Sequence, residues 1–173
     1  MSTTVLPGQT LNVSAGQTSS GVIVDAGGTL NVLSGGAVIS TIDSGLVNVS
    51  SGGRAVGTNV ASGGTVFVAA HGVDSGSTIQ SGGFQTISSG GTAKGTIVFG
   101  DFAETQFVLA GGTALNTTLH GDRHLAGFAS ITSIFGPVQD IVAGGTSIVT
   151  KVFSGGDQRC SGRPASPSPS RRC

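Results

Sequence analysis

Two imidazoles and a carboxylate lie within one short segment, His120-Gly121-Asp122-Arg123-His124. Nitrogen and oxygen ligands of this kind bind divalent metals, so His120, Asp122 and His124 are candidate ligands of a metal site. The segment lies where the sequence pattern described below weakens, and it is expected to form an inserted surface loop. A chance cluster in a polar turn is the simpler explanation, and no cofactor is predicted.

The carboxylates Asp25 and Asp43 suggest a second kind of chemistry. They are expected to share an outward position on adjacent repeats, with Arg54 close in the sequence. Glycoside hydrolysis requires two carboxyl groups roughly 5–9 Å apart, and such proximity would also raise one pKa. No third acidic or basic partner recurs nearby, so a solvated face is preferred to a carbohydrate-active enzyme.

The composition limits the remaining classes of function. The chain has 173 residues, of which 31 are Gly and 9% are charged, and eight basic residues balance eight acidic ones. Zero net charge does not fit nucleic-acid binding or a polybasic membrane surface. No run of about 20 apolar residues is available to span a membrane, and no secretory signal is visible. With 37% hydrophobic residues, the chain is expected to fold.

A repeat of about 19 residues dominates the sequence. Ser77–Gly95 reads STIQSGGFQTISSGGTAKG, and Thr58–Gly76 reads TNVASGGTVFVAAHGVDSG. The array is expected to span residues 3–158, with one 17-residue unit at Thr41–Gly57 and a degenerate stretch around 117–137. Residues 159–173, which hold both cysteines, are expected to form a disordered tail.

Aligned units give columns of aliphatic residues. The third position of the unit carries Val5, Val24, Ile42, Val60, Ile79, Val98, Leu119 and Val152. The eleventh carries Val13, Val32, Val49, Val68, Ile87, Val108 and Ile141. The ninth carries Leu11, Leu30, Val47 and Val66, followed by Gln85, Gln106 and Gln139. Stacked parallel strands bury such β-branched columns, and the recurrent Gly pairs supply turns. An all-β fold is predicted, a parallel β-solenoid of ~19-residue coils.

Outward-facing positions are the candidate contact face. The tenth position carries Asn12, Asn31 and Asn48, followed by Phe67, Thr86 and Phe107. Stacked Asn side chains can form amide ladders. The aromatic residues Phe67, Phe99, Phe107 and Phe153 either contact partners or cover one another.

Hydroxyl residues recur at the first position of the unit. They are Thr3, Thr58, Ser77, Thr96, Thr117 and Thr150. By alternation with the inward third position, they are expected to face the core or a corner and to bond to the turns. The outward second position, to which Thr41 is assigned, is mixed in type. The Thr column therefore gives little support to ice binding.

The unit [ST]-x-[VI]-x-S-G-G-x-x-x-[VI]-x-x-G-G-x-A-x-G, read from Ser77–Gly95, resembles the passenger strand-loop-strand repeat of AIDA-type autotransporter adhesins. The resemblance covers residues 3–158 and is clearest over 3–95. It implies a right-handed parallel β-helix on a Gram-negative surface, with roles in adhesion, self-association and biofilm formation. It also implies O-glycosylation by a dedicated glycosyltransferase, and Ser62, Ser81 and Ser89 occupy matching positions beside the turns. Because the family's signal peptide and translocator are missing from the sequence, the chain is expected to be a fragment or to leave the cell by another route.

These patterns predict a non-catalytic adhesive module, either extracellular or on the bacterial surface. Low charge favours self-association, because like surfaces then approach without repulsion. Other expected partners are surface glycans or proteins of a host or of bacteria. The alternatives are a β-solenoid that binds glycan or ice and, third, a carbohydrate-active enzyme.

Overall fold

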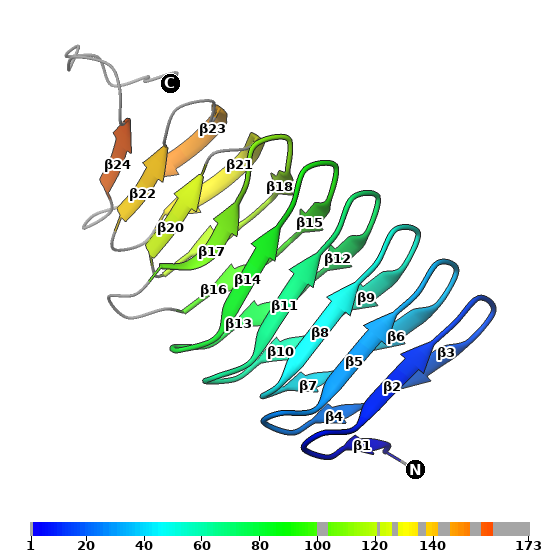
Figure 1. The fold of residues 1–173 in the computed structure, drawn as a ribbon. Coiled ribbons are helices and arrows are strands. Elements are labelled where there is room, and N and C mark those ends of the chain that lie inside the picture. The colour runs from blue at the N-terminus through cyan, green and yellow to red at the C-terminus, as the bar shows by residue number, and fades with distance from the viewer. Residues whose placement is uncertain are drawn as a thin grey trace.

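The computed structural model describes residues 2–99, 104–120, 122–125, 128–134, 138–141, 146–152 and 157–160. Side chains are described for residues 2–99 and 106–120. Within these ranges the structure contains β-strands, turns and corners, and the coils follow one another along a single axis (Figure 1).

Each regular coil has three strands in a constant order. A two-residue strand comes first, as in β1 (Thr4–Val5), β4 (Ile23–Val24), β7 (Ile42–Asp43), β10 (Asn59–Val60), β13 (Thr78–Ile79), β16 (Ile97–Val98) and β19 (Thr118–Leu119). A longer strand follows the first turn, as in β2 (Thr10–Val13), β5 (Thr29–Val32), β8 (Leu46–Val49), β11 (Thr65–Val68), β14 (Phe84–Ile87), β17 (Glu104–Val108), β20 (Asp122–Leu125), β22 (Val138–Ile141) and β24 (Asp157–Cys160). A three-residue strand closes the coil, as in β3 (Thr18–Ser20), β6 (Ala37–Ile39), β9 (Arg54–Val56), β12 (Val73–Ser75), β15 (Thr92–Lys94) and β18 (Thr113–Leu115).

Equivalent strands of neighbouring coils pair in parallel and build two sheets. The longer strands form a nine-stranded sheet in the order β2-β5-β8-β11-β14-β17-β20-β22-β24. The two-residue and three-residue strands, together with β21 (Phe128–Ile134) and β23 (Thr146–Val152), form a fifteen-stranded sheet that faces it. This pairing confirms the predicted all-β parallel solenoid. Its right-handed sense stays a prediction.

The corner between the three-residue and two-residue strands depends on one residue per coil. The backbone there has positive φ, at Gly21, Ser40, Gly57, Gly76, Gly95 and Asn116. In the next two coils the register places Ile131 and Val149 at this position, inside the continuous strands β21 (Phe128–Ile134) and β23 (Thr146–Val152). β-Branched residues disfavour positive φ, so the corner is replaced by one long strand.

The expectation of an inserted loop at His120–His124 is wrong. Asp122–Leu125 forms β20, which pairs with β17 on one side and β22 on the other. Stacking therefore continues through the degenerate stretch. The last described strand, β24, includes Arg159 and Cys160, and residues 161–173 lie outside the described residues.

Tight turns explain the Gly pairs. Gly63 has a φ of 83°, which only Gly adopts without strain. A Cβ on the second glycine, Gly64, would lie 2.2 Å from the carbonyl oxygen of Asp43 in the preceding coil. The first Gly of the pair thus provides the turn, and the second permits close stacking.

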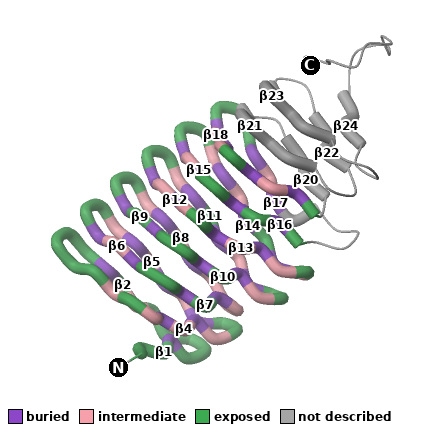
Figure 2. The backbone as a smooth tube through the Cα atoms, turned by 180° about the vertical axis from the view of Figure 1, so that it is seen from behind, coloured by how far each residue is buried: buried purple, intermediate pink, exposed green. Residues whose placement is uncertain are grey.

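Aliphatic columns fill the space between the sheets, as predicted for most positions. Figure 2 shows buried positions recurring from coil to coil along the strands. The prediction for Ile42 is wrong: Ile42 is 47% exposed, and Asp43 lies in the buried column opposite Val24. This coil is two residues shorter than its predecessor, and the loss falls in the first turn, at Ser44-Gly45. Asp43 Oδ1 accepts a hydrogen bond from the Gly45 N–H at 2.9 Å, so the buried carboxyl holds the shortened turn.

Candidate functional site

The predicted metal ligands are only partly described. His120 is exposed, and its ring stacks on Phe99 with centroids 5.1 Å apart. It follows β19 of the fifteen-stranded sheet, whereas the backbone of Asp122 and His124 belongs to β20 of the other sheet. The side chains of Asp122 and His124 lie outside the described residues. Among the described residues, no three His, Cys, Asp or Glu side chains lie together.

The expectation that Asp25 and Asp43 share an outward position is wrong. Asp43 is fully buried, and the register pairs it with Val24 rather than with Asp25. Asp25 is half-buried in the turn after β4. The two carboxylates therefore do not form the pair on one face that glycoside hydrolysis needs.

The predicted amide ladder is confirmed on the outward face of the nine-stranded sheet. Asn31 Nδ2 donates to Asn12 Oδ1 at 2.9 Å, and Asn48 Nδ2 donates to Asn31 Oδ1 at 2.9 Å. The in-register pairing of β2, β5 and β8 places these side chains above one another. The ladder ends at Asn48, because the next residue in the column is Phe67.

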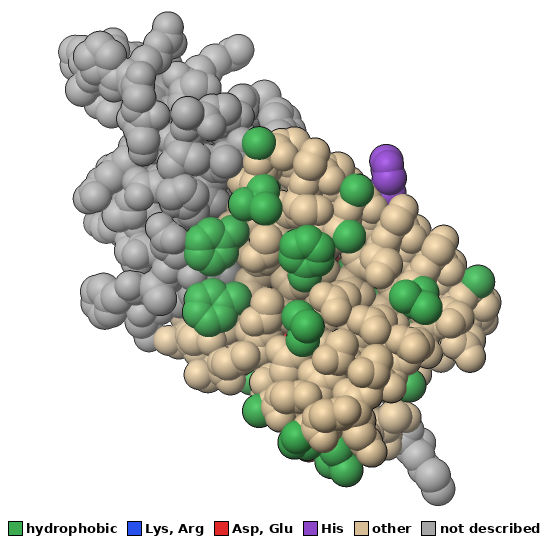
Figure 3. Space-filling model, in the orientation of Figure 1, with side chains coloured by type: hydrophobic (Ala, Val, Ile, Leu, Met, Phe, Trp, Pro, Cys, Tyr) green, Lys and Arg blue, Asp and Glu red, His purple; other side chains and the backbone are tan. Residues whose placement is uncertain are grey.

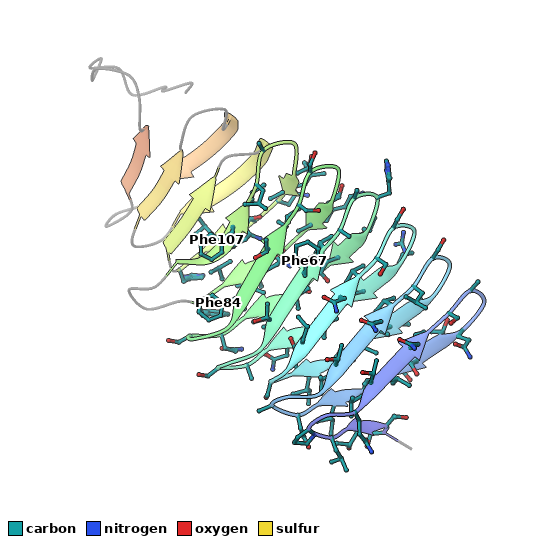
Figure 4. The ribbon with its side chains drawn as sticks, viewed as in Figure 1. Phe67, Phe84 and Phe107 are labelled. Carbon is teal, nitrogen blue, oxygen red and sulfur yellow. The ribbon has the colours of Figure 1, made fainter. Side chains whose placement is uncertain are left out.

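An aromatic patch follows the amide ladder on the same face and consists of Phe67, Phe84 and Phe107. Phe67 and Phe84 are 37% and 36% exposed, and Phe107 is half-buried. The three rings project from β11, β14 and β17 on the side shown in Figure 4. Sequence reasoning named Phe67 and Phe107 but missed Phe84. Strand alternation would have found it, because Phe84 pairs with Thr65, two residues before the outward-facing Phe67.

The outward face of the nine-stranded sheet carries no charged residue among its described side chains. Its members are Thr10, Asn12, Thr29, Asn31, Leu46, Asn48, Thr65, Phe67, Phe84, Thr86 and Phe107. Figure 3 views this face and shows apolar side chains on it but no basic or acidic ones in the described part. Exposed Arg54 and Lys94 lie on β9 and β15 of the fifteen-stranded sheet.

Beneath the aromatic patch lies an interior polar cluster of Asp74, Ser77, Gln85 and Gln106, all fully buried. Ser77 Oγ donates to Asp74 Oδ1 at 2.7 Å, and Gln85 Nε2 donates to Asp74 Oδ2. Gln106 Nε2 then donates to Gln85 Oε1 at 2.6 Å. Burial raises the pKa of Asp74 to about 6, although its hydrogen bonds oppose the rise. The inward positions of both Gln residues were predicted, whereas Asp74 was missed.

Most first-position hydroxyl residues are buried, as predicted, but Thr3 is exposed, and the side chain of Thr150 lies outside the described residues. Thr58, Ser77, Thr96 and Thr117 are buried, and so is Thr41, which belongs to this column rather than to the outward second position. The prediction that they bond to the turns is wrong for the Thr residues, whose hydroxyls have no hydrogen-bond partner among the described residues. The buried Thr residues therefore cannot present hydroxyls to ice.

The three candidate glycosylation residues are exposed and lie in turns. Ser62 and Ser81 occupy neighbouring turns on one edge of the solenoid, where the Gly63 N–H donates to the Gly82 carbonyl at 2.8 Å. Ser89 lies in a turn on the other edge, after β14.

Comparisons with known proteins bear on the fold. No family model and no curated protein matches this chain. A solved structure, the crystal structure of the TibC-catalysed hyper-glycosylated TibA55-350 fragment, is similar with a TM-score of 0.54. This chain shares the fold of that TibA fragment. The match covers 92% of this chain and 95% of the TibA fragment at 23% sequence identity, a level at which the likeness establishes the fold alone.

No helix in the described part of the chain has the length and hydropathy needed to cross a membrane.

Proposed function

We propose that this chain is a non-catalytic adhesive repeat module of a bacterial surface or secreted protein, and that it associates with copies of itself. The observation that carries the proposal is the outward face of the nine-stranded sheet, which has no charged residue among its described side chains from Thr10 of β2 to Phe107 of β17. Two such faces approach without electrostatic repulsion. Their amide and hydroxyl groups supply hydrogen bonds, and their phenyl rings supply apolar contact.

The burial of Asp43 removes the carboxylate pair that had suggested hydrolysis. The one arrangement that suggested hydrolysis needed Asp43 at the surface, and Asp43 is buried beside the shortened turn. The repeat resemblance to autotransporter passengers supports a location outside the cell.

Sedimentation velocity over a range of protein concentrations tests the self-association. We expect the wild-type chain to form larger species as its concentration rises. Thr86→Glu adds a negative charge to the outward face of β14 and should abolish them at low salt, with partial recovery when salt screens the charge. Val56→Glu adds the same charge on β9 of the other sheet, where Val56 is 37% exposed, and should leave association unchanged. A wild-type chain that stays monomeric, or equal loss in both variants, would contradict the proposal.

We further propose that Ser62, Ser81 and Ser89 accept sugar from a glycosyltransferase. Their exposure in turns supports access by an enzyme, and the similar TibA fragment is described as hyper-glycosylated by TibC. Co-expression of this chain with TibC, followed by peptide mass spectrometry, tests the assignment. Sugar should be found on these three residues and be lost site by site in the Ser→Ala variants, while buried Ser77 remains unmodified. Modification confined to other residues would refute it.

A further inference from the structure

The aromatic patch lies on the outward face of the nine-stranded sheet, and each of its rings comes from a different strand. Phe67 and Phe107 occupy the same column two strands apart, with Thr86 between them, so their Cα atoms are about 10 Å apart along the solenoid axis. Phe84 lies on the intervening strand, two residues to one side. Figure 4 shows the three rings on one face of the solenoid. Rings spaced in this way suit an extended chain better than a single small molecule.

Hydrogen-bonding groups border the rings. Thr86 lies between Phe67 and Phe107 and is half-buried. Asn48 is the last member of the amide ladder: its Nδ2 donates to Asn31, while its Oδ1 is directed to no described donor. The patch therefore combines apolar ring faces with a hydroxyl and an amide oxygen at their edges.

The exposed aromatic area is small for a protein partner. A phenyl side chain has about 150–250 Å² of surface, so Phe67 and Phe84, exposed by 37% and 36%, offer roughly 150 Å² together. A standard protein interface needs about 800 Å² from each side. A sugar ring matches the smaller patch, because it has an apolar C–H face and a rim of hydroxyls. No charged side chain among the described residues of this face would select an acidic or a basic sugar.

We propose that Phe67, Phe84 and Phe107 form a stacking platform for an extended, neutral oligosaccharide, with Thr86 and Asn48 bonding its hydroxyls. This binding goes beyond the proposed self-association and does not depend on it. It adds a carbohydrate-binding activity to the outward face.

A single reporter residue tests the proposal in the full-length chain. The protein has no Trp or Tyr, so Phe84→Trp introduces a lone fluorophore that keeps an aromatic face at the platform. Cellohexaose and chitohexaose are the probes, and polygalacturonate is the charged comparison. We expect at least one neutral hexamer to change the emission of the introduced indole saturably. Phe99→Trp, at an exposed ring outside the patch, is the matched control and should not respond.

Calorimetry without the reporter separates stacking from other contacts. Phe67→Ala and Phe107→Ala should each weaken binding about two- to tenfold, and Phe84→Tyr should preserve it. Circular dichroism verifies that each variant folds. Three results would overturn the proposal: no saturable response to either neutral hexamer, tighter binding of polygalacturonate, or ring variants that alter sedimentation but not sugar binding. The last result would identify the patch as a protein contact, whereas a monomeric chain that binds sugar would contradict only the proposed self-association.

Discussion

The early and the later coils with described side chains differ in which face of the nine-stranded sheet carries polar residues and which carries apolar ones. In the early coils the interior column is aliphatic, with Leu30 and Val47, and the outward column holds the amide ladder. In the later coils the interior column holds Gln85 and Gln106, and the aromatic patch lies outside. The backbone pairing is parallel and in register in both regions.

This difference indicates that the residue type at an interior position depends on the side chains of the adjacent coils as well as on burial. Each buried Gln donates to a polar neighbour, since Gln106 Nε2 bonds Gln85 and Gln85 Nε2 bonds Asp74. Gln106 Oε1 has no partner among the described residues. A buried amide with partners costs little, whereas a buried amide without them costs about 1–3 kcal/mol. In this interior column the two buried amides therefore stand on adjacent strands, where one can bond the other.

The largest expected effect is the pH dependence of stability that the two buried carboxyls, Asp43 and Asp74, cause. Burial raises the pKa of Asp43 to about 7, and Asp74, which accepts more side-chain hydrogen bonds, is raised to about 6. Because both folded-state values exceed the ordinary value of 3.8, protonation favours the folded state. Stability should be greatest below pH about 4 and should fall as pH rises through 6 and 7, by on the order of 3–4 kcal/mol for each carboxyl.

Urea unfolding at several pH values measures this dependence. Asp74→Asn should remove the part of the decline that starts near pH 4 and is complete near pH 6, and Asp43→Asn the part that is complete near pH 7. Stability that rises between pH 5 and 8 would show that neither carboxyl is buried as described.

The next largest effect on stability is expected when the interior residue type of the later coils is placed in the early coils. Leu30→Gln puts an amide of similar size between Leu11 and Val47, which offer it no hydrogen bond. The loss of apolar burial and the unsatisfied amide together should lower the free energy of unfolding by about 3–5 kcal/mol. Leu30→Met keeps the site apolar and should cost about 1 kcal/mol. A cost for Leu30→Gln as small as that of Leu30→Met would mean that the early interior tolerates amides.

Most of the fold could be predicted from the sequence, because each column recurs once per coil. The aliphatic columns, the amide ladder and the inward Gln residues followed from strand alternation alone. The predicted burial was wrong where an apolar residue was assumed to face the core and its polar neighbour to face the solvent. Ile42 was placed inside because it is apolar, yet Asp43 is the buried residue, held by the shortened turn. Asp74 was missed because its partner Gln85 lies on β14 of the other sheet, 11 residues further along the chain.

The reciprocal exchange, Gln85→Leu, should cost less than Leu30→Gln. The new side chain gains apolar burial, but Asp74 loses a donor and Gln106 loses an acceptor. We expect a loss of about 2–3 kcal/mol in urea unfolding at neutral pH. Adding Asp74→Ala should recover part of that loss, because it removes the carboxyl left without its amide partner. Additive losses in the double variant would show that Gln85 and Asp74 are not coupled.

Substitutions on the outward face should have the smallest effects on the free energy of unfolding, because water can replace a hydrogen bond lost at the surface. Asn31 is the centre of the amide ladder, where it donates to Asn12 and accepts from Asn48. Asn31→Ala should lower the free energy of unfolding by about 1 kcal/mol, and Asn12→Ala, which removes one bond, by about half as much. Thr86→Ala, on the aromatic half of the same face, should change it by less than about 0.5 kcal/mol. Equal effects of Asn31→Ala and Thr86→Ala would show that the ladder does not stabilise the fold. Contact with partners would then be the role that is left for the Asn residues.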